Sequence, residues 1–276
     1  MNNNESNKIN SQNQQEITET RQMLINSRLR EPVSGIFALL PLIADNINKS
    51  NGDKALVHLE TVSRQSYALL RSVTNITLAA KIMSGKQTTS ELINFSALLE
   101  SVIFGVKTVI NNITIDAEIE NNIMISGNRD LISNAVLNLI SNSLYFASDK
   151  PVKIFIKLKS DKKNAVFNYR DNSKGIKDTN IEKVFSPYFS HDPYDDNEPS
   201  PSLGLGLYIA RAAFEQAGGT MLLSSSFGDG VKYTVSIPSD DPNSDILESR
   251  PSDFLLNRYS NLFVQLCNHC NLPPLS

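Results

Sequence analysis

Apolar residues in the first third of the chain recur at alternating intervals of three and four positions. Between residues 29 and 47 the intervals are 4-3-4-3-4, and a second series between residues 59 and 83 follows the same rule. This spacing gathers the apolar side chains of a helix into one narrow seam, as in helix bundles. The turn-forming stretch 49–52 separates the two series. We therefore predict a two-helix hairpin over residues 21–85, preceded by a polar segment, 1–20, that is disordered or frays.

A different period marks the second half of the chain. Five short stretches have the composition or the alternation of β-strands, and residues 130–146 have an apolar face at helical spacing. We predict an α+β protein: a two-helix hairpin, an α/β sandwich over residues 86–238 with one polar and one helix-covered sheet face, and a linker with a C-terminal extension, 239–276. Within that extension, residues 259–266 fit a short strand or an amphipathic turn of helix. The five predicted strands are 113–119, 152–158, 165–169, 220–225 and 231–237.

A hairpin of two helices leaves its apolar seam uncovered. Pairing with a second copy buries two such seams in a four-helix bundle. The pattern therefore predicts a homodimer formed through residues 21–85.

Composition narrows the classes of partner. A net charge of −3 and an isoelectric point near 5.7 provide no electrostatic basis for binding nucleic acid. The longest apolar run, residues 35–44, is roughly half the length that crosses a bilayer, so we predict no membrane span and a cytoplasmic location.

Two glycine-containing turns carry the chemistry. Asp171 is followed closely by Gly175 and Ile176, and about thirty residues later Gly204 and Gly206 lead into a helix. A carboxylate can read an exocyclic amine, while glycines let backbone N–H groups approach phosphates at a helix N-terminus. Together the two turns predict a nucleotide pocket.

Two asparagines on the helix 130–146 have two interpretations. Asn138 and Asn142 are four residues apart, so they project on one side of the helix. They are either solvated residues of an outer face or amide oxygens that hold a hydrated Mg²⁺ and its phosphates. The nearby glycine turns favour the second interpretation.

The order of these motifs resembles the ATP-binding domain of bacterial sensor histidine kinases, in the class that includes gyrase, Hsp90 and MutL. The resemblance implies ATP and Mg²⁺ as cofactors, with Asn142 at the Mg²⁺ position and Asp171 reading adenine. Residues 184–189 resemble the F box, and the hairpin resembles a dimerisation and phosphotransfer domain. The nucleotide-binding positions that it implies are Asn138, Asn142, Tyr145, Asp171, Gly175, Ile176, Gly204, Leu205, Gly206 and Leu207.

The hairpin differs from this family at the phosphoacceptor motif. The stretch Ser27-Arg28-Leu29-Arg30-Glu31-Pro32-Val33 aligns with the phosphoacceptor motif, and its acceptor histidine is then Ser27. At the next position the family has an acidic residue that serves as general base. This chain has Arg28 there, and arginine cannot accept a proton. His58 and His191 lie outside the acceptor register, so we predict no autophosphorylation on the usual site.

The nucleotide pocket also departs from the family pattern. Ser173 and Ser202 replace glycines and lose easy access to positive φ. Tyr145 stands where a phosphate-binding lysine is common, and the predicted lid, 190–202, carries four carboxylates and no lysine or arginine. These departures predict weak nucleotide binding.

Two functions of different class follow. The chain is a histidine kinase-like protein of two-component signalling that binds ATP and Mg²⁺, or it is a non-catalytic dimeric scaffold that docks a response regulator or an intact partner kinase. In the tail, Cys267, His269 and Cys270 have metal-like spacing, but a structural zinc site needs four ligands, and we interpret the cysteines as two reduced thiols.

Overall fold

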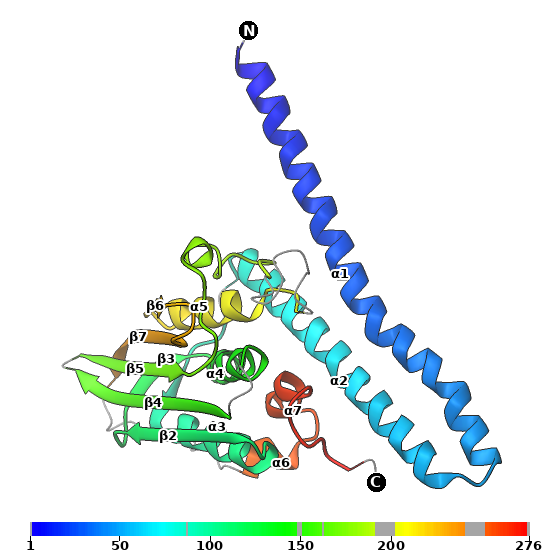
Figure 1. Cartoon of the computed structure of the whole chain (residues 1–276). Coiled ribbons are helices and arrows are strands. Elements are labelled where there is room, and N and C mark those ends of the chain that lie inside the picture. The colour runs from blue at the N-terminus through cyan, green and yellow to red at the C-terminus, as the bar shows by residue number, and fades with distance from the viewer. Residues whose placement is uncertain are drawn as a thin grey trace.

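The computed structural model describes residues 2–86, 88–147, 151–161, 163–190, 202–240 and 252–274, with side chains from residue 18 onward apart from 178, 252 and 253. Helices α1 (Asn2–Asn48) and α2 (Gly52–Met83) form the predicted hairpin, and the N-terminal part of α1 extends beyond the rest of the molecule (Figure 1). The helix thus continues through residues 2–20, where the sequence predicted disorder or fraying. The first helix breaker in the chain is Pro32, and Gln and Glu favour helix, so no residue before it interrupts the helical backbone.

The second half is a seven-stranded sheet in the order β1-β3-β7-β5-β4-β2, with β6 also paired to β7. Only β2 and β4 run parallel to each other; the other described pairs are antiparallel. All five predicted strands are present, and two four-residue strands, β1 and β3, are additional. The strands are β1 (Glu91–Asn94), β2 (Ile113–Ile119), β3 (Met124–Gly127), β4 (Val152–Asp161), β5 (Asn164–Asp171), β6 (Thr220–Ser225) and β7 (Val231–Asp240).

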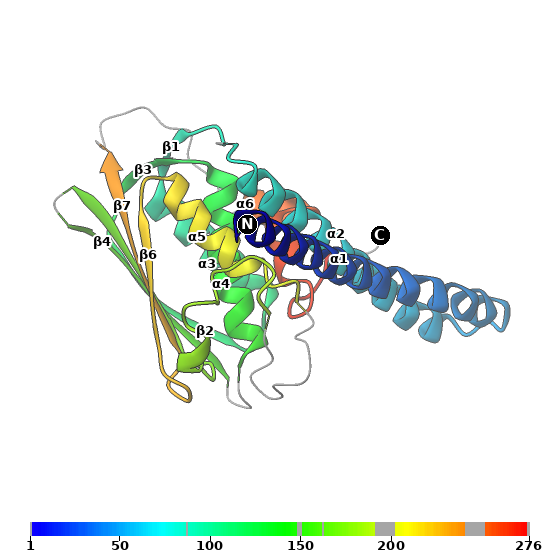
Figure 2. The same cartoon turned by 90° about the horizontal axis from the view of Figure 1, so that it is seen from above.

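Three helices cover one face of this sheet: α3 (Phe95–Val109), α4 (Arg129–Tyr145) and α5 (Gly206–Gln216). Seen from above, the layers follow one another as sheet, helices and hairpin, and no described helix covers the other sheet face (Figure 2). Strand β4 shows why: Val152, Ile154 and Ile156 are buried, whereas Lys153 and Phe155 between them are exposed. Alternation of period two therefore produces one apolar face, which the helices bury. The predicted fold class is confirmed.

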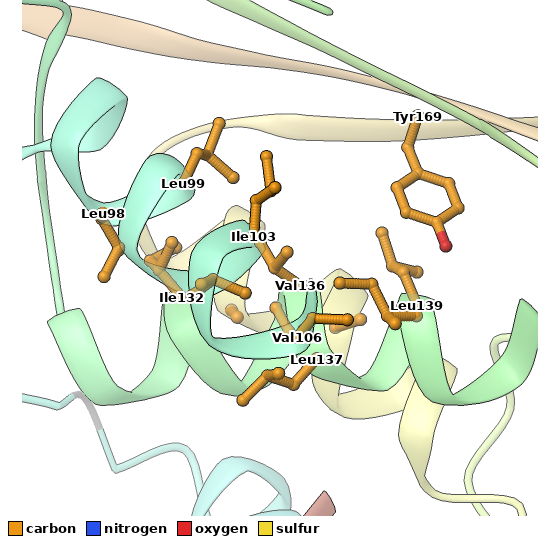
Figure 3. Packing of buried hydrophobic residues seen from close by; sticks show 14 of the residues in the cluster. Leu98, Leu99, Ile103, Val106, Ile132, Val136, Leu137, Leu139 and Tyr169 are labelled. Carbon is orange, nitrogen blue, oxygen red and sulfur yellow. The ribbon is translucent and has the colours of Figure 1, made fainter. Parts of the chain in front are cut away.

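The core lies between α3, α4 and the sheet. Leu98, Leu99 and Val106 of α3 belong to one cluster with Val136 and Leu139 of α4, and the ring of Tyr169 on β5 extends toward Leu139 (Figure 3). All of these side chains are buried. Because α4 is packed on both sides, its orientation is rigidly set, and α4 carries the asparagines of the predicted site.

The described part of the C-terminal extension, residues 252–274, contains two short helices, and the second of them lies between the hairpin and the sheet domain (Figure 1). After α6 (Ser252–Leu256), helix α7 (Asn261–Leu266) contacts α2, α3 and α4. The guanidinium Nη1 of Arg64 on α2 donates to the carbonyls of Cys267 and Cys270 at 3.1 and 3.2 Å. The Tyr67 hydroxyl donates to the carbonyl of Arg258 at 2.7 Å. The extension is therefore a joint between the two parts of the molecule, and its residues 261–266 form a helix rather than a strand.

Cys267 and Cys270 are free, buried thiols. Over the described residues, no group of three or more His, Cys, Asp or Glu side chains is arranged to hold a metal ion. The described helices also include none that is long and apolar enough to cross a membrane.

Candidate functional site

Asp171 is the anchor of the site. Strand β5 ends at this residue, and the carboxylate is buried. Its Oδ1 accepts hydrogen bonds from the backbone N–H and the hydroxyl of Ser173, at 3.0 and 2.7 Å, and from the backbone N–H of Val231 at 3.0 Å. Its Oδ2 accepts a hydrogen bond from Ser143 of α4. Four donors from three elements therefore hold the carboxylate in one orientation.

Two buried tyrosines near Asp171 are kept neutral. Burial raises the pKa of Tyr169 and of Tyr233, and the negative charge of Asp171 adds to the increase. The Tyr169 hydroxyl lies 2.7 Å from Ser143 Oγ. Protonated phenols in this position do not compete with Asp171 as anions, so the charge of the pocket floor belongs to the carboxylate.

Ser173 does not strain the first turn, although the sequence predicted that a serine here would restrict it. The described residues with positive φ include Gly175, at 74°, but neither Ser173 nor Ser202. The position that needs glycine is Gly175, because a Cβ there would lie 2.2 Å from the carbonyl oxygen of Ser226. The serine also supplies the hydroxyl that binds Asp171, so this departure from the family pattern strengthens the anchor.

A pocket opens in front of Asp171, and most of the predicted residues line it. On its walls are seven of them: Asn142, Asp171, Gly175, Ile176, Gly204, Gly206 and Leu207. Phe146 and Lys177 also line it, and sequence reasoning missed both. Lys177 places a basic residue on the pocket wall.

Three predicted residues lie outside this pocket. Asn138 is buried, and its Nδ2 donates to Oδ1 of Asn134 at 3.1 Å. Its Oδ1 lies 3.2 Å from the place where a Cβ of Gly206 would be. Asn138 therefore supports the second glycine turn from behind. Leu205 and Tyr145 line a second cavity next to the pocket; Leu205 is buried in the core, and the ring of Tyr145 packs edge-on against that of Phe146.

The side chains of Asn142 and Asn138 project in different directions, because four residues of a helix turn through slightly more than one full turn. Asn142 is half-buried and lines both the pocket and the second cavity. An amide oxygen is a ligand that Mg²⁺ accepts, with the remaining positions taken by phosphates and water. The residue set fits a Mg²⁺–nucleotide whose metal has one protein ligand.

The second glycine turn is held against the F-box segment. Gly204 has φ 64°, and a Cβ on it would lie 2.2 Å from the carbonyl oxygen of Phe189. The ring of Tyr188 lies under the guanidinium of Arg21 on α1, at 5.5 Å from the ring centroid. Residues 191–201, the bulk of the predicted lid with His191 and the four carboxylates, lie outside the described residues.

The hairpin presents Arg28, and not Ser27, to the site. Ser27 is exposed, and its hydroxyl donates to the carbonyl of Leu24 at 2.9 Å. Arg28 lines the second cavity together with Asn142 and the glycine turn. Ser27 is not among the residues lining that cavity. His58 is half-buried on α2 and lines neither cavity.

Comparison with known proteins agrees with this geometry. Residues 127–241 match the family described as "Histidine kinase-, DNA gyrase B-, and HSP90-like ATPase". The chain is 28% identical over 155 residues to sporulation kinase B of Bacillus subtilis (strain 168), which covers 55% of this chain and 35% of that protein. It is 26% identical over 233 residues to hybrid signal transduction histidine kinase B of Dictyostelium discoideum, covering 79% of this chain and 11% of that protein. The chain thus spans about a third or less of these relatives.

Solved structures show the same fold. The Acinetobacter baumannii histidine kinase AdeS superposes with a TM-score of 0.55 at 18% identity, covering 77% of this chain and 98% of that one. Full-length ShkA in complex with AMPPNP superposes with a TM-score of 0.52 at 14% identity, covering 81% of this chain and 47% of that one.

Proposed function

We propose that this chain, which carries the core of a sensor histidine kinase with a histidine kinase-, DNA gyrase B- and HSP90-like ATPase domain, binds ATP and Mg²⁺ but does not phosphorylate itself at the usual position. The observation that carries the nucleotide part is the anchored carboxylate of Asp171 in a pocket edged by two glycine turns. We assign the protein to two-component signalling, and its similarity to a hybrid signal transduction histidine kinase supports this assignment.

The base is assigned to the Asp171 end of the pocket. Oδ1 already accepts three hydrogen bonds and Oδ2 one, so Oδ2 keeps a lone pair for an exocyclic amine. A hydrogen bond to a charged acceptor contributes about 1.5–3 kcal/mol. The glycine turn would then hold the phosphates, and the Asn142 amide oxygen would be the protein ligand of Mg²⁺.

Calorimetry with ATP and ADP in the presence of Mg²⁺ tests this assignment. Asp171→Asn should weaken both nucleotides by roughly tenfold to a hundredfold, because an amide is a poorer acceptor than a carboxylate. Asp161→Asn is the matched control, since Asp161 is exposed at the far end of β4. Circular dichroism of Asp171→Asn checks that the fold is kept, and Asn142→Ala probes the same pocket without removing a buried acceptor. Absence of binding by the wild-type chain would contradict the proposal.

The acceptor position supports the second half of the proposal. A serine hydroxyl needs a general base to become a nucleophile, and the neighbouring Arg28 cannot accept a proton. Ser27 is also exposed, with its hydroxyl bonded to its own helix. Both the chemistry and the orientation of this residue therefore oppose phosphoryl transfer.

Incubation with radiolabelled ATP and Mg²⁺ tests this point. The wild-type chain should gain no acid-labile, base-stable label. Ser27→His alone should gain little, because Arg28 disfavours a protonated imidazole beside it. Ser27→His with Arg28→Glu should gain a trace of such label at saturating ATP. Acid-labile label on the wild-type chain would contradict the proposal and make His58 the residue to test.

A second candidate is a non-catalytic dimeric scaffold that docks a response regulator or an intact kinase. The observation that favours it is the exposure of large apolar side chains on the hairpin. Phe37, Leu40 and Ile47 of α1 are 68%, 48% and 60% exposed in the single chain. Pairing with a second copy would bury them in a four-helix bundle.

A further inference from the structure

The second cavity lies between the hairpin and the ATPase domain, next to the nucleotide pocket. It measures about 260 Å³ and is lined by residues of α1, α2, α4 and the second glycine turn. The nucleotide pocket and the second cavity share five residues: Asn142, Phe146, Ser202, Gly204 and Gly206. Asp171 lines only the nucleotide pocket, whereas Arg28 and Arg71 line only the second cavity. A nucleotide with its base on Asp171 and its phosphates on the glycine turn therefore points its terminal phosphate toward the two arginines.

The lining of the second cavity is cationic. Its charged residues are Arg28, Arg71 and Glu31. The side chain of Arg28 is only 16% exposed, whereas that of Glu31, which accepts from Arg28 Nη1 at 3.4 Å, is 69% exposed and lies toward solvent. Arg71 is fixed from the other side, because its Nη2 donates to the Ser141 hydroxyl of α4 at 3.0 Å. Guanidinium groups remain protonated even when buried.

The side chains of Arg28 and Arg71 line the same cavity, and this lining carries one more basic than acidic residue, so the cavity favours an anion. Arginine is suited to this role, since its planar fork binds phosphate oxygens in a bidentate manner. We infer that Arg28 and Arg71 bind the terminal phosphate of ATP across the interface, so that a nucleoside triphosphate, and not a diphosphate, holds the hairpin against the ATPase domain. The inference rests on the proposed nucleotide binding. It also gives the substitution at position 28 a role: the residue that cannot serve as a base becomes a phosphate ligand.

Calorimetry on the full chain with Mg²⁺–ATP and Mg²⁺–ADP tests the inference. Arg28→Gln should weaken ATP binding by about tenfold to a hundredfold while ADP binding changes by less than about twofold. Arg28→Lys keeps the charge but loses the fork, so its effect on ATP should be intermediate. Arg30→Gln is the matched control, since Arg30 is exposed on the same helix and lines neither the nucleotide pocket nor the second cavity. It should change neither affinity.

Hydrogen exchange provides a second readout that does not depend on a variant. ATP should slow amide exchange in α1 around residue 28 and in α2 around residue 71 more than ADP does. If the wild-type chain binds both nucleotides but Arg28→Gln changes the two affinities equally, or changes neither, the inference is wrong while the proposed function stands. If the wild-type chain binds neither nucleotide, the proposed function itself fails and the inference fails with it.

Discussion

The backbone N–H of Tyr188 donates to the carbonyl of Gly204 at 3.1 Å, and both residues have positive φ, 67° and 64°. This bond joins the F-box segment to the second glycine turn. A tyrosine in this conformation costs about 1–2 kcal/mol, so the surrounding structure has to enforce it. The contact therefore marks a position where the nucleotide pocket depends on tight backbone packing.

Gly204→Ala should disrupt this contact. The new Cβ would lie 2.2 Å from the Phe189 carbonyl oxygen, so the F-box segment must move. We expect a loss of stability of about 2–4 kcal/mol and nucleotide binding weakened at least tenfold, measured by urea unfolding and calorimetry.

Gly85→Ala is the control for this change. Gly85 has nearly the same φ, 68°, at the end of α2, but a Cβ there meets no atom within 4 Å. It should cost about 1 kcal/mol, the backbone penalty alone, and leave nucleotide binding unchanged. Equal effects of the two alanines would show that packing at Gly204 is unimportant.

Gln265 should be needed to hold the C-terminal extension on the hairpin. It is buried on α7, and its Nε2 donates to Oδ1 of the buried Asn75 on α2 at 3.0 Å. Gln265→Leu leaves the Asn75 amide without this donor, so unfolding in urea should show a loss of about 1–3 kcal/mol.

A double-mutant cycle separates this bond from packing. Gln265→Leu combined with Asn75→Leu should cost less than the sum of the two single changes, because neither partner is then left unsatisfied. Strict additivity would mean that the two side chains do not stabilise each other.

His269 should make stability depend on pH. Burial, and then the charge of Arg71, lower its pKa to about 4. In the unfolded chain the pKa of His269 is near 6.5, so between pH 4 and pH 6.5 the unfolded chain binds more protons than the folded chain. The free energy of unfolding therefore has its full value above about pH 6.5 and falls as the pH drops toward 4. The loss should be of the order of 2 kcal/mol, after allowance for partial exposure. His269→Gln should remove this part of the slope in urea unfolding curves measured from pH 7 to pH 4.5. An unchanged slope would assign the pH dependence to other groups.

Phe37→Glu should dissociate the proposed homodimer. Phe37 is 68% exposed on α1, and a carboxylate at that place would put a charge among the exposed apolar side chains that a second copy would cover. Light scattering at micromolar concentration should give the mass of two chains for the wild type and of one for the variant. Leu222→Glu is the control, because Leu222 is 67% exposed on β6, away from the hairpin. A monomeric wild-type chain would contradict the dimer.

Most of the secondary structure could be predicted from the sequence. The alternation of Val152, Ile154 and Ile156 with exposed residues predicts a half-buried strand wherever it lies, because successive side chains of a strand point to opposite faces. Asp171 with Gly175, and Gly204 with Gly206, predicted the pocket for an equally local reason: each turn needs its own special backbone geometry. The helix α3 was missed, although Asn94 caps it by accepting from the Ala97 N–H at 3.0 Å and is followed by a periodic apolar series.

The sequence by itself determined the hairpin and the five longer strands, because these follow from the spacing of apolar side chains. It also determined where a nucleotide-binding turn is possible, because such turns need the backbone conformations that glycine adopts freely. Only the tertiary structure decided which of two asparagines one turn apart faces the pocket, because the packing of α5 behind Gly206 buries Asn138 and leaves Asn142 accessible. It also decided that Arg28 rather than Ser27 faces the glycine turn, and that α7 joins the two parts of the molecule. Those relationships join residues more than sixty positions apart, and they depend on the shape of packed surfaces that no local pattern encodes.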